Sequence, residues 1–181
     1  MNLPNVISLG RLLSTPVVIW LILTDAVVWA FWAFSMAAMS DAIDGFIAKR
    51  FDSATILGAY LDALADKALL ASVYVVLGAV GQLPLWLVLL VVFRDLLIVG
   101  GALLLWLLTR SFRIKPLMVS KVNTVAQIIL AMMVLGRLGF GVTVEGAEII
   151  QIYVVAAAAL VSGASYMMGW MRIIGQAEIK Q

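Results

Sequence analysis

Runs of apolar residues make up nearly the whole of this chain, and only short polar breaks separate them. Of the 181 residues, 65% are hydrophobic and 12% are charged, which is far from the balance of a soluble domain. A helix needs roughly 20 apolar residues to cross about 30 Å of lipid hydrocarbon. Because this length allows about six crossings and no separate soluble part, we expect an all-α integral membrane protein with one domain over residues 1–181.

The apolar runs and the residues that interrupt them predict six transmembrane helices with short connections. The stretch NLPNVISLGR precedes them, and its proline and amphipathic pattern are typical of a short segment along the membrane interface. The first apolar run is interrupted by Asp25 and lacks a small-residue cleavage site, so we interpret it as a retained span rather than a signal peptide. The expected helices cover residues 11–24, 27–50, 57–81, 84–109, 119–138 and 146–172.

Basic residues set the expected orientation, because cytoplasmic loops of membrane proteins are enriched in Lys and Arg. With six crossings, four basic groups fall on one side, while the other side has Asp25, Glu145 and Glu148 with Arg137 as its one cation. We therefore expect both termini in the cytoplasm. A protein of an organelle would normally carry a transit peptide, so we expect a bacterial inner membrane. The four groups are Arg11; Lys49 and Arg50; Arg110, Arg113 and Lys115; and Arg172 and Lys180.

Composition excludes several kinds of chemistry. The chain has neither Cys nor His, which excludes disulfides, thiolate and imidazole metal ligands, Cys nucleophiles and triads with a His base. The net charge of +2 is too small to favour nucleic acid as a partner. Any chemistry must come from carboxylates, Lys, Arg, Tyr or hydroxyl groups.

Residues 40–67 contain five aspartates, and four of them form two pairs at helical spacing. Asp41 and Asp44 are three residues apart, and Asp62 and Asp66 are four apart, so each pair shares one face of a helix. An antiparallel hairpin of the second and third helices would bring both pairs to similar depth. Four carboxylates in a partly dehydrated site stay ionised only with cations between them. With oxygen as the sole ligand type, we expect Mg²⁺ or Mn²⁺, as two ions with a bridging carboxylate.

Two other interpretations of the aspartates remain open. Surface carboxylates at a helix turn suit Asp52, but not four aspartates at helical spacing. A proton or ion pathway is the stronger rival because intramembrane acids often mark one, although the cluster lies in one hairpin without a matching broken helix. Gly45, Ala48 and Gly58 lie one turn from the aspartates, where they would leave room for a ligand's phosphates; close helix packing is their alternative role.

The aspartates and small residues together match a known pattern. The spacing Asp41-x-x-Asp44-Gly45-x-x-Ala48-Lys49, followed after eight residues by Gly58-x-x-x-Asp62-x-x-x-Asp66, resembles the signature of the CDP-alcohol phosphotransferase family. One position departs, because the family usually has Arg where this chain has Lys49, and Arg50 follows. Lys keeps the positive charge but lacks the planar fork that binds phosphate through two hydrogen bonds, so the phosphate contact falls to either Lys49 or Arg50.

The resemblance implies a six-helix membrane enzyme, commonly a homodimer, that transfers a phosphatidyl group from CDP-diacylglycerol to an alcohol and releases CMP. By motif position, Asp41, Asp44 and Asp62 would bind the metal ions, and Asp66 would be both a metal ligand and the general base. The residues that would contact CDP-diacylglycerol are Gly45, Ala48, Lys49 and Gly58.

The alcohol acceptor is expected near the start of the fifth helix. The run KPLMVSKVNTVAQIIL resembles the corresponding part of CMP-forming cardiolipin synthases, which use phosphatidylglycerol. Phosphatidylglycerophosphate synthases tend to have Lys where this chain has Asn123, and a phosphodiester lipid needs fewer cations than glycerol 3-phosphate. The expected acceptor residues are Arg113, Lys121 and Asn123, whereas Arg94 and Asp95 are interpreted as an ion pair within the bundle.

These features together predict a cardiolipin synthase that acts at the cytoplasmic face, among membrane lipids and as a homodimer. The alternative within the family is a phosphatidylglycerophosphate synthase that uses glycerol 3-phosphate as acceptor. Outside enzymes, the alternative is an ion transporter.

Overall fold

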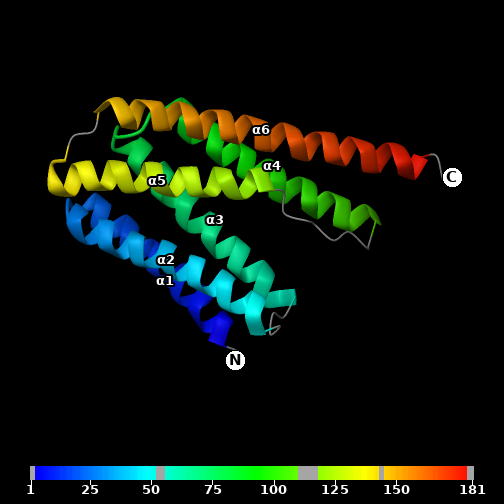
Figure 1. Cartoon of the computed structure of the whole chain (residues 1–181), viewed down its shortest axis with the longest axis horizontal. Coiled ribbons are helices and arrows are strands. Elements are labelled where there is room, and N and C mark those ends of the chain that lie inside the picture. The colour runs from blue at the N-terminus through cyan, green and yellow to red at the C-terminus, as the bar shows by residue number, and fades with distance from the viewer. Residues whose placement is uncertain (1–2, 52–55, 110–117, 143–144, 179–181) are drawn as a thin grey trace.

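The structure is a computed structural model of the whole chain. It describes the backbone of residues 3–51, 56–109, 118–142 and 145–178, and the side chains of residues 10–40, 67–101, 118–142 and 146–171. Six α-helices account for nearly all of these residues (Figure 1). They are α1 (Leu3–Leu23), α2 (Val27–Phe51), α3 (Ile56–Ala79), α4 (Leu85–Thr109), α5 (Met118–Phe140) and α6 (Glu145–Glu178).

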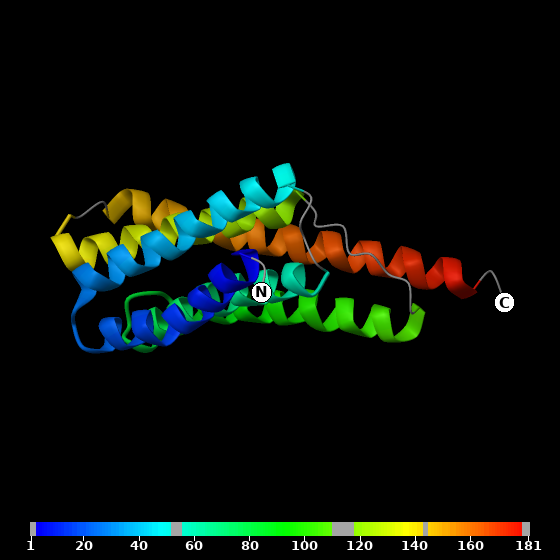
Figure 2. The ribbon, with the colours of Figure 1, turned by 90° about the horizontal axis from the view of Figure 1, so that it is seen from below.

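The helices run along the length of the molecule and pack in a ring (Figures 1 and 2). Around the ring, α1 contacts α2, α2 contacts α5, α5 contacts α6, α6 contacts α4, α4 contacts α3, and α3 contacts α1. A further contact joins α3 and α5 across the ring. These two helices therefore supply much of the core, with Tyr74 and Leu77 of α3 and Leu130 and Leu135 of α5 fully buried.

The six predicted helices are confirmed, and their bounds differ by more than two residues only at the start of α1 and the end of α6. The helix α1 begins at Leu3, so the segment expected along the interface is the first part of one continuous helix. Pro4 lies in its first turn, where a missing backbone N–H costs no hydrogen bond. At the other terminus, α6 continues to Glu178, because no Pro follows residue 172 and the single Gly175 does not end the helix.

Three helices end at the same end of the molecule, and each is followed by a residue with a left-handed backbone. These residues are Asp25 after α1, Gly81 after α3 and Gly141 after α5, with φ of 58°, 73° and 68°. At Gly81 the turn is closed because the backbone N–H of Gln82 donates to the carbonyl of Leu77 at 2.8 Å. The turns at this end of the bundle are therefore short and hydrogen-bonded.

At the same end, Arg137 joins α5, α6 and the turn between α3 and α4. Arg137 near the end of α5 donates from Nε and Nη2 to the two carboxylate oxygens of Glu148 in α6, at 2.8 Å and 3.3 Å. Its Nη2 also donates to Oε1 of Gln82, in the turn between α3 and α4, at 3.1 Å. This contact accounts for the one cation that the sequence places on the acidic side.

The outer surface of the described helices is apolar. Large hydrophobic side chains such as Trp29, Phe93 and Met118 are 66–75% exposed, as expected of a surface that faces lipid. Among the described side chains, α5 and α6 contain apolar stretches of 23 and 26 residues, long enough to cross a membrane. Every helix has at least 21 residues and is therefore about 30 Å long or longer.

Close packing of α4 on α6 depends on a glycine. A Cβ atom at Gly101 would overlap the indole ring of Trp170, whereas a Cβ atom at the neighbouring Gly100 would meet nothing within 4 Å. The pair therefore offers a matched comparison within one turn of one helix.

We expect Gly101→Ala to lower the stability of the protein by about 1–3 kcal/mol, because the new methyl group forces the indole ring from its place. Gly100→Ala should not destabilise it, since Ala is the better helix former and has open space there. Thermal unfolding in detergent measures both. Equal losses in the two variants would contradict the close contact with Trp170.

Candidate active site

The four aspartates lie in the second half of α2 and the first half of α3. Asp41 and Asp44 belong to α2 and Asp62 and Asp66 to α3, and the ends of these helices lie at the end opposite the short turns (Figure 1). Asp44 is seven residues before the end of α2 and Asp62 is six residues after the start of α3, or about 10 Å and 9 Å along their axes. The helix bounds thus put Asp44 and Asp62 at comparable distances from the ends of α2 and α3 that face their connection, and the convergence of the four side chains stays a prediction.

Most of the predicted site residues have side chains outside the described part. This holds for the four aspartates and for Gly45, Ala48, Lys49, Arg50 and Gly58, whose backbone is helical, while Arg113 lies outside the described residues altogether. The side chains that are described contain no group of three or more acidic residues placed to hold a metal ion. The predicted metal and nucleotide ligands therefore stay predictions.

Helix α5 runs past the aspartates. Its C-terminal half packs on the start of α2, where a Cβ atom at Gly139 would lie 3.3 Å from the backbone of Val28 and one at Gly136 would lie 3.6 Å from the ring of Phe31. The two helices are antiparallel, so the same register, continued along both, brings Asn123 of α5 level with Asp44 of α2. The start of α5 therefore lies at the depth of the aspartate-bearing backbone.

A hydrogen bond between α3 and α5 places Asn123 at the same depth along the bundle. The hydroxyl of Tyr74 donates to the backbone carbonyl of Gln127 at 3.0 Å. Side chains on a helix point back toward its N-terminus, so this hydroxyl lies about one turn before Tyr74 along α3. Asn123, one turn before Gln127, is then level with the backbone near Asp66.

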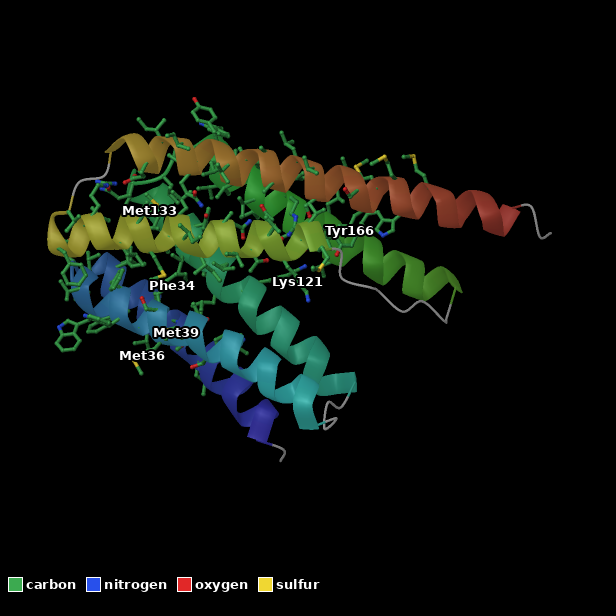
Figure 3. The ribbon with its side chains drawn as sticks, in the orientation of Figure 1. Phe34, Met36, Met39, Lys121, Met133 and Tyr166 are labelled. Atoms are coloured by element: carbon green, nitrogen blue, oxygen red, sulfur yellow. The ribbon has the colours of Figure 1, made fainter. Side chains whose placement is uncertain are left out.

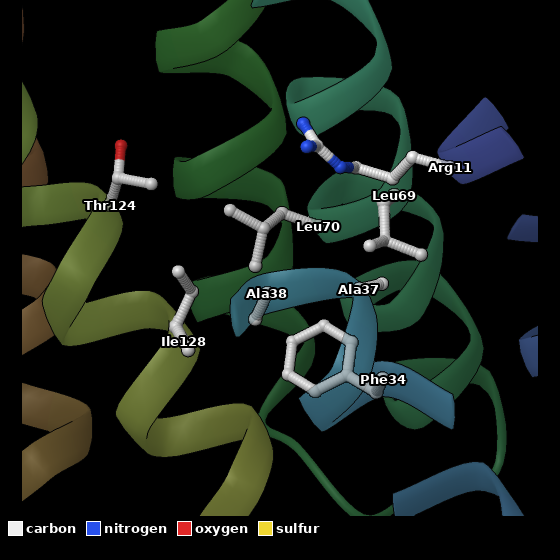
Figure 4. A pocket seen from close by; sticks show the side chains of 8 residues that line it. All are labelled: Arg11, Phe34, Ala37, Ala38, Leu69, Leu70, Thr124 and Ile128. Carbon is white, nitrogen blue, oxygen red and sulfur yellow. The ribbon is translucent and has the colours of Figure 1, made fainter. Parts of the chain in front are cut away.

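A small pocket lies between these helices (Figure 4). Its walls include Ala37 and Ala38, one turn before Asp41, and Leu69 and Leu70, one turn after Asp66. Its free space of about 20 Å³ is room for one water molecule. The remaining lining residues are Arg11, Phe34, Thr124 and Ile128. The pocket thus lies between α1, α2, α3 and α5, about one turn from the aspartate-bearing backbone of α2 and α3.

The two described acceptor candidates lie on different faces of α5. Lys121 is exposed and extends away from α6 (Figure 3), on the helix face that it shares with Thr124 and Ile128 of the pocket. Asn123 is fully buried on the inner face. The structure therefore brings Lys121 to the pocket side at the depth of the aspartates and places Asn123 inside the bundle.

Comparison with known proteins identifies the family. A family model described as CDP-alcohol phosphatidyltransferase matches residues 1–172. The chain belongs to this family. Proteins of the CDP-alcohol phosphatidyltransferase family are integral membrane proteins, in agreement with the all-helical fold and its apolar surface.

Named relatives fall into two groups. A chloroplastic CDP-diacylglycerol–glycerol-3-phosphate 3-phosphatidyltransferase 1 of Oryza sativa is 38% identical over 158 residues, which cover 78% of this chain and 48% of the relative. A cardiolipin synthase (CMP-forming) / mitochondrial hydrolase fusion protein of Schizosaccharomyces pombe is 31% identical over 196 aligned positions, which cover 99% of this chain and 33% of the relative. The cardiolipin synthase (CMP-forming) of Rattus norvegicus is 31% identical over 145 residues, which cover 71% of this chain and 48% of the relative. The chain spans about half or less of the length of these relatives.

Arg94 forms the predicted ion pair and two further contacts that the sequence did not reveal. Its Nη1 donates to Oδ1 of Asp95 at 2.5 Å, and its Nη2 donates to Oγ of Ser120 in α5 at 2.8 Å and to Oγ of Ser162 in α6. Arg94 is 4% exposed. One guanidinium therefore joins α4, α5 and α6 directly beside Lys121.

From the sequence alone, Arg11 is interpreted only as one of the basic residues that predict the orientation in the membrane. In the structure its side chain is buried. It is 4% exposed and extends across Leu69 at the pocket (Figure 4). The sequence prediction began the first helix at Arg11, whereas α1 begins at Leu3 and carries this residue two turns inside. A buried cation thus lies about one turn from the aspartate-bearing backbone of α3.

We expect Arg94→Met to destabilise the protein by about 3–5 kcal/mol, because it leaves the buried carboxylate of Asp95 without its ion-pair partner. The double variant Arg94→Met with Asp95→Leu should regain part of this loss, since it removes the buried charge as well. Thermal unfolding of the three proteins gives the comparison. A double variant that is no more stable than Arg94→Met would contradict a net cost of the unpaired carboxylate.

Proposed function

We propose that this protein transfers a phosphatidyl group from CDP-diacylglycerol to the hydroxyl of an alcohol and releases CMP. The observation that carries the proposal is the aspartate signature on the ends of α2 and α3, in a chain whose family match covers residues 1–172. The proposed protein is a single transmembrane domain with six crossings, a homodimer in the bacterial inner membrane, with the aspartates toward the cytoplasm.

Divalent metals fit the residues that the signature supplies. Asp41, Asp44, Asp62 and Asp66 offer only carboxylate oxygens, and the chain has no Cys or His to favour a softer metal. We assign two Mg²⁺ or Mn²⁺ ions to these four residues. When bound, such ions would neutralise the diphosphate and stabilise charge on its oxygens.

In the proposed reaction, the oxygen of the acceptor hydroxyl attacks the phosphorus that bears the diacylglycerol. Asp66 accepts the proton of this hydroxyl. A new phosphorus–oxygen bond forms, the bond from phosphorus to the CMP oxygen breaks, and CMP leaves. The small residues Gly45, Ala48 and Gly58 would let the nucleotide approach, and Lys49 or Arg50 would contact its phosphates. The mostly apolar walls of the pocket one turn away would disfavour water in that part of the site.

Two acceptors have support. Phosphatidylglycerol, which would give cardiolipin, is favoured by the segment around Lys121 and Asn123 and by relatives named as cardiolipin synthases. Glycerol 3-phosphate is favoured by the relative from Oryza sativa, at 38% identity. Our leading proposal is cardiolipin synthase, with phosphatidylglycerophosphate synthase as the second candidate. Arg113, Lys121 and Asn123 are the proposed acceptor residues in both.

An ion transporter fits the structure less well. Inside the bundle, buried polar side chains occur from the depth of Arg94 to that of Gln127. Closer to the short turns, the next layer of buried side chains is apolar. Within the part that the structure describes, this layer consists of fully buried Leu77, Leu87, Leu130 and Val134. A pathway for ions would need polar groups to continue there.

CMP release by the purified protein tests the proposed function. The assay contains Mg²⁺ or Mn²⁺ and CDP-diacylglycerol, with phosphatidylglycerol or glycerol 3-phosphate offered separately, and the lipid product is identified by mass spectrometry. Cardiolipin supports the leading proposal and phosphatidylglycerophosphate the second candidate. A chelator should abolish turnover with either acceptor. Absence of CMP with every alcohol would overturn the enzymatic proposal.

We expect Asp66→Asn to reduce kcat at least about a hundredfold, because an amide cannot accept the proton of the attacking hydroxyl. Metal binding and thermal stability should change much less, since three aspartates remain. Turnover and metal affinity are measured on the same preparation. Substantial residual turnover would remove Asp66 from the role of base.

Lys121→Ala should raise the KM for the acceptor about tenfold while it leaves the KM for CDP-diacylglycerol nearly unchanged, because the exposed ammonium would bind the acceptor's phosphate. Lys121→Arg is the matched control, since it keeps the charge. Steady-state kinetics with each substrate varied in turn separates the two constants. Equal effects on both substrates would count against an acceptor-side role.

A further inference from the structure

Two neighbouring amides on the inner face of α5 have unbonded polar atoms. Asn123 is 0% exposed, and neither its Nδ2 nor its Oδ1 has a hydrogen-bond partner among the described residues. Gln127, one turn later, is 2% exposed, and its Nε2 is unbonded as well.

Several buried or half-buried polar side chains around this pair are bonded, and Arg94 is bonded through both Nη atoms although its Nε is not. Tyr74 donates to the carbonyl of Gln127, Ser162 accepts from Arg94, and Nε2 of Gln151 donates to the carbonyl of Ala126 at 3.0 Å. Buried amides without partners are rare because they lose their bonds to water and gain none in the protein. Two of them, one turn apart, are typical of side chains that bind something other than the protein.

The position of Asn123 relates the pair to the proposed active site. The packing of α5 on α2 and the bond from Tyr74 to Gln127 both place Asn123 level with the aspartate-bearing backbone. Thr124, the next residue, lines the pocket between α2, α3 and α5. The amides therefore lie at the depth of the reaction, on the face of α5 next to the one that carries Lys121.

The bonding capacity of the amides defines the ligand. Asn123 offers one acceptor atom and a donor, and Gln127 offers a further donor. A hydroxyl group donates and accepts, so it can bond to both atoms of Asn123. A phosphate oxygen only accepts, and it would be repelled by Oδ1 of the same amide. The site therefore suits an uncharged hydroxyl group.

We propose that Asn123 and Gln127 bind the hydroxyl group of a glycerol-type acceptor that does not react. This inference rests on the proposed function. Glycerol 3-phosphate and the headgroup of phosphatidylglycerol both carry a secondary hydroxyl beside the primary hydroxyl that would attack phosphorus. Binding the secondary hydroxyl orients the primary one, so the pair selects for glycerol among alcohols of similar size and charge.

Matched acceptors with and without the secondary hydroxyl test the inference. Glycerol 3-phosphate is compared with 3-hydroxypropyl phosphate, and phosphatidylglycerol with its propane-1,3-diol counterpart. The wild-type protein should favour the glycerol compound by at least about tenfold in kcat/KM, because the analogue leaves the buried amides unpaired. This comparison needs no variant, so it stays decisive if a substitution prevents folding.

In the variants Asn123→Leu and Gln127→Met, the ratio of kcat/KM for the glycerol compound to kcat/KM for its analogue should fall close to one. Only kcat/KM for the glycerol compound should decrease. Their unfolding midpoints should not fall, since each replaces an unbonded amide by an apolar group of similar size. Gln151→Leu is the matched control. It should lower the midpoint, because it removes the bond to Ala126, and leave the preference for glycerol unchanged.

The outcomes separate this inference from the proposed function. Equal kcat/KM for paired acceptors in the wild-type protein would overturn the inference while CMP release still supported the enzyme. Equal losses on both acceptors in Asn123→Leu and Gln127→Met would also overturn it, and would assign the amides a structural role. Absence of CMP with every acceptor would overturn the proposed function and the inference with it.

Discussion

Lipid offers no hydrogen bonds, and this constraint decides where most polar groups of the bundle lie. Hydroxyl side chains bond to a carbonyl one turn earlier in their own helix; Ser14, Thr15, Thr24, Ser35, Ser40, Thr124 and Ser165 all do so. Charged groups pair inside the protein, as Arg94 does with Asp95 and Arg137 does with Glu148. Against this background, the unbonded amides of Asn123 and Gln127 mark a place where folding alone does not account for the residues.

The sequence predicts the helices well because lipid makes hydrophobicity a strong signal. An apolar run of about 20 residues has few other structures open to it, so the number of helices and most of their ends follow from the runs and their breaks. The start of α1 does not, because NLPNVISLGR is both amphipathic and compatible with a helix. Interface segments and helix extensions share that pattern.

The residues of the candidate site also include some that the sequence predicts and some that it does not. The aspartates follow from spacing, since helix geometry alone puts residues three or four apart on one face. The partners of Arg94 do not follow, because Ser120 and Ser162 are far away in sequence and meet it only through the packing of α4, α5 and α6. Nor does the burial of Arg11, which depends on where α1 begins.

The short turns at Asp25, Gly81 and Gly141, with the ion pair of Arg137, fasten one end of the bundle and leave the aspartates at the other. A rotation of roughly 5° about the fastened end would move the far end of a helix about 30 Å long by about 3 Å. The spacing between α5 and the aspartate-bearing stretches of α2 and α3 is therefore sensitive to small tilts of whole helices, whereas the turns at the fastened end set their register.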